Sequence, residues 1–126
     1  MPQTPPLLAP HINPDSSYGK AALKFAHALT NRNFSAAHEQ LSSSLRSSLS
    51  AEDLKENYER MINAYDSPPS LVDLTTTMEV WPDKQPNDIE WAYTTIAGAD
   101  WAEAVTVVIA NKSNAPVVRS LEWGRP

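Results

Sequence analysis

Two charged residues fall on the apolar side of predicted β-strands. Glu103 and Arg119 are the only charged residues on the apolar face of the last three strands. An ion that is buried without a partner costs several kcal/mol, so each needs a partner, a ligand or water. In the predicted register they lie about 13 Å apart, which argues against a direct pair. Two interpretations stay open: both are solvated, or Arg119 anchors an anion in a cavity near Trp91 and Tyr93.

The four tryptophans are the strongest physical signal in the chain. All lie in its second half: Trp91, Trp101 and Trp123 share one strand parity, and Trp81 ends the first predicted strand. Large aromatic side chains fill cores by default. On a curved sheet of a small domain they also line apolar ligand sites or self-association faces. The candidate ligand-binding residues are therefore Trp91, Tyr93, Glu103, Arg119 and Trp123.

Other residues whose side chains could take part in catalysis or metal binding are better explained as surface or packing residues. Asp73 and Glu79 share a predicted strand face, but six residues, about 20 Å, separate them, which is too far for one substrate atom. His11, His27 and His38 form no i, i+4 pair of the kind that binds metals on helices. We expect no metal site and no catalytic residue from these groups.

Composition excludes several further classes of function. The chain has no cysteine and three glycines, so thiol chemistry, a G-x-S-x-G elbow and glycine-rich phosphate loops are absent, and no cofactor is expected. Fifteen acidic and ten basic residues give a net charge of -5, which argues against nucleic-acid and membrane-surface binding. Residues 67–126 carry eight acids and four bases. A partner of this half would be basic or apolar.

The length of 126 residues predicts one domain preceded by an irregular arm. Residues 1–14 contain five prolines, which disfavour helices and sheet ladders, and we expect the domain over 15–126. The arm lacks the charged start and the apolar length of a signal peptide. No apolar run approaches the length of a membrane span. We therefore expect a cytoplasmic protein.

Apolar spacing predicts three helices in the first half of the domain. The first begins after Asp15 and ends near Asn31. The second begins at Asn33 or Ser35 and continues through a serine-rich stretch that lowers its helix propensity. The third begins at Ser50, with Asp53 three residues later as a variant of the capping box, and Pro68-Pro69 ends it. The apolar stripes of the three helices are Tyr18, Ala22, Phe25 and Leu29; Phe34, Ala37, Leu41 and Leu45; and Leu54, Tyr58, Met61 and Tyr65.

After residue 70 the apolar period becomes two, which predicts four strands, over 72–80, 89–95, 101–109 and 117–123. Loops at Gly98–Asp100 and around Ser113 connect them as an antiparallel meander. Aligning the more apolar faces sets Tyr93 opposite Val105 and Val107 opposite Arg119. The fold class is α+β, with three helices packed on one face of a curved four-stranded sheet.

This order resembles the nuclear transport factor 2-like superfamily, the cone-shaped fold shared with ketosteroid isomerase and polyketide cyclases. The local pattern is similar as well: Phe25, Leu29, Asn33-Phe34 at a helix start, Ala36-Ala37, Leu41 and a capped helix from Ser50. The resemblance implies a pocket between helices and sheet, and a homodimer through the convex face of the sheet. The acidic and histidine positions of the catalytic members have no one-to-one match here, so their activity is not carried over.

We therefore expect a non-catalytic domain that binds a small apolar or amphipathic ligand, or a protein partner, through the sheet side. One alternative is a cofactor-free isomerase or cyclase that uses pocket acid–base residues. Another is a small bacterial immunity-type protein, which the acidic sheet half suggests. An enclosed carboxylate or histidine in a pocket would favour the enzyme.

Overall fold

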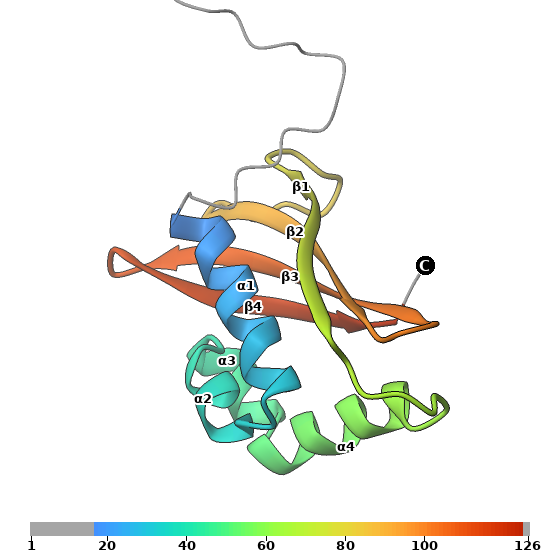
Figure 1. The fold of residues 1–126 in the computed structure, drawn as a ribbon. Coiled ribbons are helices and arrows are strands. Elements are labelled where there is room, and N and C mark those ends of the chain that lie inside the picture. The colour runs from blue at the N-terminus through green and yellow to red at the C-terminus, as the bar shows by residue number, and fades with distance from the viewer. Residues whose placement is uncertain (1–16, 125–126) are drawn as a thin grey trace, which may run out of the picture.

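The computed structural model describes residues 17–124 and has helices in the first half and strands in the second (Figure 1). The arm expected at residues 1–14 lies outside the described residues. The helices are α1 (Ser17–Thr30), α2 (Phe34–Glu39), α3 (Ser43–Ser48) and α4 (Ala51–Ile62). The strands are β1 (Leu71–Met78), β2 (Asp88–Ala97), β3 (Ala102–Lys112) and β4 (Ala115–Trp123). The α+β prediction is confirmed.

The second predicted helix is wrong in one respect, because the chain forms two short helices there. Between α2 and α3 the backbone pairs with β4 instead of continuing the helix. The Ser42 amide donates to the Val118 carbonyl (2.8 Å), and the Val118 amide donates to the Gln40 carbonyl (2.8 Å). The Ser42 hydroxyl then accepts from the Leu45 amide and caps α3. Serines favour such caps over helix interiors, which explains why the serine-rich stretch breaks here.

The third predicted helix, α4, begins as the sequence indicates but ends at Ile62, before Tyr65 and Pro68-Pro69. The Ser50 hydroxyl accepts from the Asp53 amide, and the Asp53 carboxylate accepts from the Ser50 amide, both at 3.0 Å. This reciprocal capping box satisfies two amides that the first turn would otherwise leave without partners. Leu54 and Tyr58 are buried on the inner face of the helix.

The four strands form one antiparallel sheet in sequence order, as predicted. It is strongly twisted, so that β1 runs across the direction of β3 and β4 in Figure 1. Helix α1 lies across one face of the sheet, and α2, α3 and α4 lie beyond it on the same side. No helix within residues 17–124 covers the other face, which we call the outer face.

The predicted register of β2 on β3 is wrong by one residue. Tyr93 pairs with Thr106, whereas Val105 pairs with Thr94. The prediction aligned the more apolar face of each strand, but residues 104–110 of β3 are all buried, so this central strand has no polar face to guide the alignment. A shift of one residue moves every side chain to the opposite face. The small residue Ala92 therefore faces α1, while Trp91 lies on the outer face.

The register of β3 on β4 differs for two reasons. Ser113 and Asn114 form a two-residue turn with φ of 54° and 65°, the combination typical of a type I′ hairpin. Farther along, the pairing skips Arg119 at a bulge, and Val107 then pairs with Leu121. The sequence has no glycine at the tight turn or at the bulge that would have indicated either feature.

The core lies between the helices and the inner face of the sheet. Its largest fully buried apolar side chains come from α1, the segment between α2 and α3, α4 and the three strands β2 to β4; they are Phe25, Leu29, Leu41, Leu54, Tyr58, Ile96, Val105, Val107, Ile109 and Val118. None of the helices within the described part of the chain is both long and apolar enough to cross a bilayer.

Candidate functional site

The five candidate ligand-binding residues lie on two different faces of the sheet. Glu103 and Trp123 lie on the inner face, at the end of the sheet near α4. Trp91, Tyr93 and Arg119 lie on the outer face, where Trp91 and Tyr93 stack with ring centroids 6.2 Å apart. The structure therefore brings together two groups of residues rather than one site.

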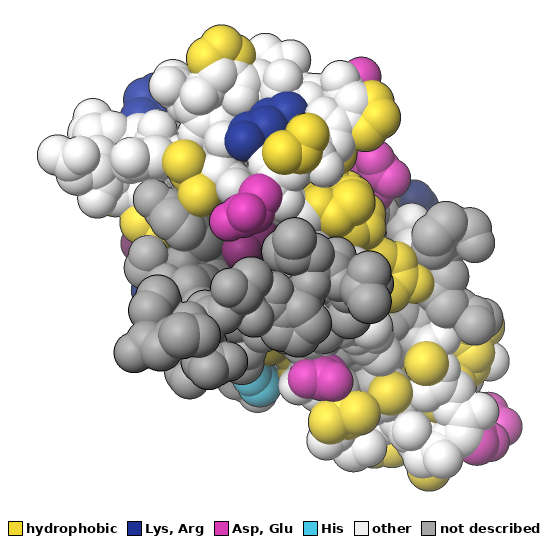
Figure 2. All heavy atoms as spheres, turned by 90° about the horizontal axis from the view of Figure 1, so that it is seen from above, with side chains coloured by type: hydrophobic (Ala, Val, Ile, Leu, Met, Phe, Trp, Pro, Cys, Tyr) yellow, Lys and Arg dark blue, Asp and Glu magenta, His cyan; other side chains and the backbone are white. Residues whose placement is uncertain are grey.

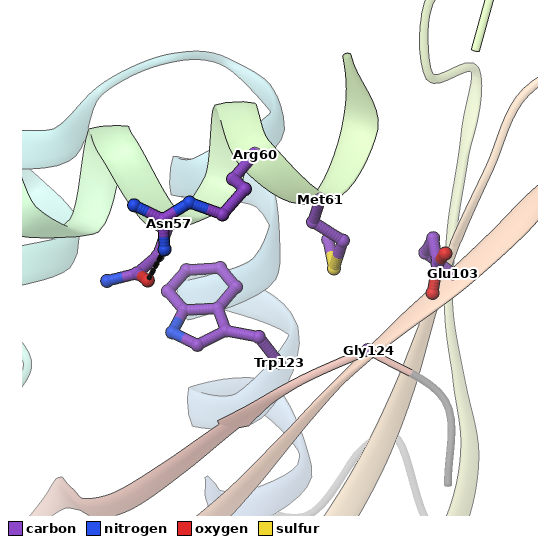
Figure 3. A pocket seen from close by; sticks show the side chains of 6 residues that line it. All are labelled: Asn57, Arg60, Met61, Glu103, Trp123 and Gly124. Carbon is purple, nitrogen blue, oxygen red and sulfur yellow. Dashed lines mark hydrogen bonds between the residues drawn. The ribbon is translucent and has the colours of Figure 1, made fainter. Parts of the chain in front are cut away.

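The inner group lines an open recess of about 340 Å³ between α4 and the ends of β3 and β4. We call it the helix-side recess. Figure 3 shows the Trp123 ring lying against the opening, with the Met61 side chain projecting from α4 beside it. These two side chains form an apolar wall next to the core, since both pack against the buried cluster while remaining partly exposed.

Polar groups stand at two opposite ends of the helix-side recess (Figure 3). At one end, an Arg60 guanidinium nitrogen donates to the Asn57 amide oxygen (3.2 Å). At the other end lies the Glu103 carboxylate, which accepts a hydrogen bond of 2.6 Å from the Tyr65 hydroxyl. The recess thus combines an apolar wall with a cationic end and an anionic end.

Aromatic packing holds Tyr65 in place beside Glu103. Its ring stacks on Trp101 with a centroid separation of 4.5 Å and an interplanar angle of 5°. The Trp101 indole nitrogen donates to the Ser67 carbonyl (2.9 Å) and contacts the Ser67 hydroxyl (3.0 Å). Gly98 approaches the same indole so closely that a Cβ there would lie 2.1 Å from the ring nitrogen. This packing fixes the direction from which the phenol reaches Glu103.

A second recess, of about 210 Å³, lies on the outer face, and we call it the outer-face recess. Trp81 and Trp91 line it, and Thr106 and Val108 form part of its lining at the centre of the sheet. Both β3 residues are at least nine-tenths buried although no described helix covers them. Large neighbouring side chains therefore shield the centre of the outer face.

Arg119 enters the outer-face recess already paired with a buried carboxylate. Its Nε and Nη2 donate to the two carboxylate oxygens of Asp88 at 2.5 and 2.7 Å. The Asp88 side chain has no exposed surface, whereas that of Arg119 is 34% exposed. Asp88 Oδ2 also accepts from the Gln85 amide (2.8 Å). A register shift follows Asp88 in β2, and another skips Arg119 in β4; such bulges redirect side chains.

Two groups outside the recesses have pKa values that the fold shifts. The hydrogen bonds that Asp53 accepts from the backbone and side chain of Ser50 lower the pKa of its carboxyl. Burial raises the pKa of the Tyr58 phenol, an effect that the nearby Arg32 charge partly opposes. The Tyr58 hydroxyl is buried and has no hydrogen-bond partner among the described residues.

Sequence reasoning missed most of the residues that complete the two recesses. Met61 and Tyr65 both belong to the predicted apolar stripe of the third helix. Met61 does line the helix-side recess, whereas Tyr65 lies beyond the end of α4 and donates to Glu103 beside the recess. Arg60 and Asn57 carried no such signal, since polar residues on a helix surface are ordinary. Asp88 also carried none, because its partner lies 31 residues away across the sheet.

Within residues 17–124, no group of three or more histidine, aspartate and glutamate side chains lies close enough to hold a metal ion. Comparisons with protein-family models, with curated proteins and with solved structures found no match to this chain. The side chains of the two recesses are therefore the features that bear on function.

Proposed function

We propose that this protein is a non-catalytic binding domain that holds a small amphipathic molecule in the helix-side recess. The observation that carries the proposal is the composition of this recess: Trp123 and Met61 form an apolar wall, Arg60 lies at one end and Glu103 at the other. Ligand sites are typically concave, mostly apolar and of at least 300 Å³, with a few polar groups that orient the ligand. The volume of about 340 Å³ is at the lower end of that range.

The recess favours a ligand with a flat apolar body and an anionic group. An aromatic or fused-ring body would stack on Trp123, while a carboxylate or sulfonate would reach the Arg60 guanidinium. Glu103 would repel a second anionic group and favour a hydroxyl or amine at the opposite end. Such a ligand is amphipathic, as the sequence led us to expect.

The resemblance to the nuclear transport factor 2-like superfamily supports this location, and membership of that superfamily is part of the proposal. In such domains the ligand pocket lies between the helices and the sheet, which is the side of the helix-side recess. The resemblance alone also implies a homodimer through the outer face.

The fluorescent probe 1-anilinonaphthalene-8-sulfonate combines fused rings with one sulfonate and tests the proposal directly. With about 20 non-hydrogen atoms at about 0.3 kcal/mol each, it should bind with a Kd on the order of tens of micromolar. We expect one probe molecule to bind per chain. Energy transfer from tryptophan to the bound probe should be lower in Trp123→Phe than in the wild-type protein. Arg60→Gln should weaken binding roughly fivefold through the lost charge.

Arg46→Gln is the matched control, because Arg46 is likewise an exposed arginine on a helix but does not line the recess. The Arg46→Gln variant has the same net charge as the Arg60→Gln variant. If both variants bind the probe equally, or if the folded protein binds no probe at all, the helix-side recess is not the ligand site.

A second candidate, acid–base catalysis, is favoured by the Tyr65–Glu103 hydrogen bond of 2.6 Å beside the recess. A phenol that donates to a carboxylate is the kind of pair that moves protons in isomerases and cyclases. Proton exchange of an enolisable ketone in deuterated water, followed by NMR, tests this role. Exchange that is catalysed by the protein and lost in Glu103→Gln would establish the enzyme over the binding domain.

A further inference from the structure

Two carboxylates line the outer-face recess, and neither is that of Asp88, the partner of Arg119. Asp83 lies in the segment between β1 and β2, and Glu122 lies in β4. Among the described residues, neither carboxylate makes a hydrogen bond or an ion pair. The two residues line the recess together with Trp81 and Trp91.

We propose that the outer-face recess binds an arginine side chain from a basic segment of a partner protein. Two tryptophan rings and two carboxylates in one recess provide the groups that a guanidinium prefers. Its plane stacks on an indole face, and its parallel N–H groups donate to carboxylate oxygens. The volume of about 210 Å³ is small, which suits one long side chain better than a whole ligand.

The fold already shows that a cation is stable on one of these rings. Lys84 Nζ lies 5.6 Å from the centroid of the Trp81 ring, and the same nitrogen donates to the Glu79 carbonyl (2.7 Å). This single positive charge does not balance Asp83 and Glu122. The ion pair of Arg119 is neutral as a unit, so the lining keeps a negative excess.

The surroundings of the recess favour a protein segment over a small free cation. Val80 is 78% exposed next to Trp81, and Met78 pairs with Trp91 on the same face. Figure 2, which views the molecule from above and labels no residue, shows acidic side chains beside apolar ones on the described part of that surface. A peptide can cover this apolar border while its arginine fills the recess, whereas a polyamine cannot cover it. Interfaces commonly combine such an anchor with an apolar surround.

The same charges argue against a second copy of this chain as the occupant, and therefore against the homodimer that the resemblance alone implies. The outer face carries Asp73, Asp83 and Glu122 without ion-pair partners among the described residues. A twofold contact through this face would set like charges against each other at close range, which is unfavourable. A basic partner meets no such repulsion.

The test is titration calorimetry of the full chain with a capped hexapeptide of alternating arginine and glycine. We expect one arginine peptide to bind per chain. The corresponding lysine peptide should bind more weakly, and the corresponding glutamate peptide should not bind. Each of Asp83→Asn and Glu122→Gln should weaken the arginine peptide roughly tenfold, the loss typical of one charge-assisted contact. Raising the salt concentration should weaken binding of the wild-type protein as well.

Asp73→Asn is the matched control, since it removes one exposed charge from the outer face without touching the recess. It should change the affinity less than twofold. Three results would overturn the proposal: no peptide binding at millimolar concentration, equal losses in the control and the recess variants, or spermidine binding as tightly as the peptide. Sedimentation that shows a dimer which Trp81→Ser dissociates would identify a second copy as the occupant and would also overturn it.

Discussion

Replacing Arg119 with methionine should destabilise the protein far more than its partial exposure suggests. The change leaves the Asp88 carboxylate, whose side chain has no exposed surface, without its cationic partner. Breaking a buried pair from one side costs about 3–5 kcal/mol, because a charge remains uncompensated. Asp88 still accepts from the Gln85 amide at 2.8 Å, so we expect the lower end, about 3 kcal/mol. For a chain of this length that corresponds to a fall in Tm of about 10 °C.

Replacing the other partner of the pair, Asp88, should cost much less unfolding free energy. Asp88→Asn keeps an oxygen that can accept from the Gln85 amide and from Arg119, and the arginine, 34% exposed, can turn to water. We expect a loss of about 1 kcal/mol, typical of one weakened hydrogen bond. The double variant should cost about 2 kcal/mol, less than Arg119→Met alone, since it buries no charge. The resulting coupling energy is about 2 kcal/mol.

Urea unfolding followed by tryptophan fluorescence and circular dichroism measures these free energies, provided that the m-value stays constant. Lys112→Met is the control, because Lys112 is an exposed cation whose contact to the Ser43 hydroxyl (2.9 Å) lies at the surface. It should change stability by less than about 0.5 kcal/mol. The reasoning is refuted if Arg119→Met costs less than about 1 kcal/mol, or no more than Asp88→Asn.

Four further changes test the packing that positions the recesses. Ser50→Ala should cost about 1 kcal/mol of unfolding free energy by removing the α4 cap. The fold lowers the pKa of Asp53, so its carboxylate stabilises the protein at pH values above the unfolded pKa near 3.9. That stabilisation is lost as pH falls through the lower pKa of the folded state. In Asp53→Asn, the loss of stability on acidification should lack the part that Asp53 contributes. Tyr58→Phe should leave stability unchanged or raise it by about 1 kcal/mol, since it removes a buried hydroxyl without a partner, and a clear loss in thermal unfolding would show that this hydroxyl is hydrogen-bonded. Gly98→Ala should cost about 1–3 kcal/mol by pushing the Trp101 indole off Ser67, and unchanged near-UV circular dichroism would contradict that displacement.

Local patterns in the sequence were sufficient to predict α1, the start of α4 and the four strands. The capping box of Ser50 and Asp53, the apolar stripe of α1 and the alternation in the strands all report on neighbours within a few residues. The break between α2 and α3 could not be predicted in this way. It depends on hydrogen bonds between the 40–42 segment and Val118, which the sequence separates by more than 70 residues.

Which candidate residues lie together depended on the sheet register, and the register had no local signal in β3. Hydrophobic alternation specifies a register where one face is polar, but Val105, Thr106, Val107 and Val108 are all buried. Two bulges then moved Asp88 and Arg119 into a contact that no spacing rule predicts. The grouping of the tryptophans by strand parity was therefore wrong, because Trp123 and Trp91 lie on different faces of the sheet.

The shift of one residue has a functional consequence, because it separates two surfaces that a single pocket would have joined. Trp123 and Glu103 face α4, whereas Trp91 and Arg119 lie across the thickness of the sheet. A ligand in the helix-side recess therefore cannot touch the outer-face recess, and the buried residues of β3 between them pack on both sides. Binding of the naphthalene sulfonate should accordingly be unaffected by Glu122→Gln, and binding of the arginine peptide should be unaffected by Arg60→Gln. A domain with two such independent faces can carry a small molecule and a protein partner at the same time, which a single shared pocket does not allow.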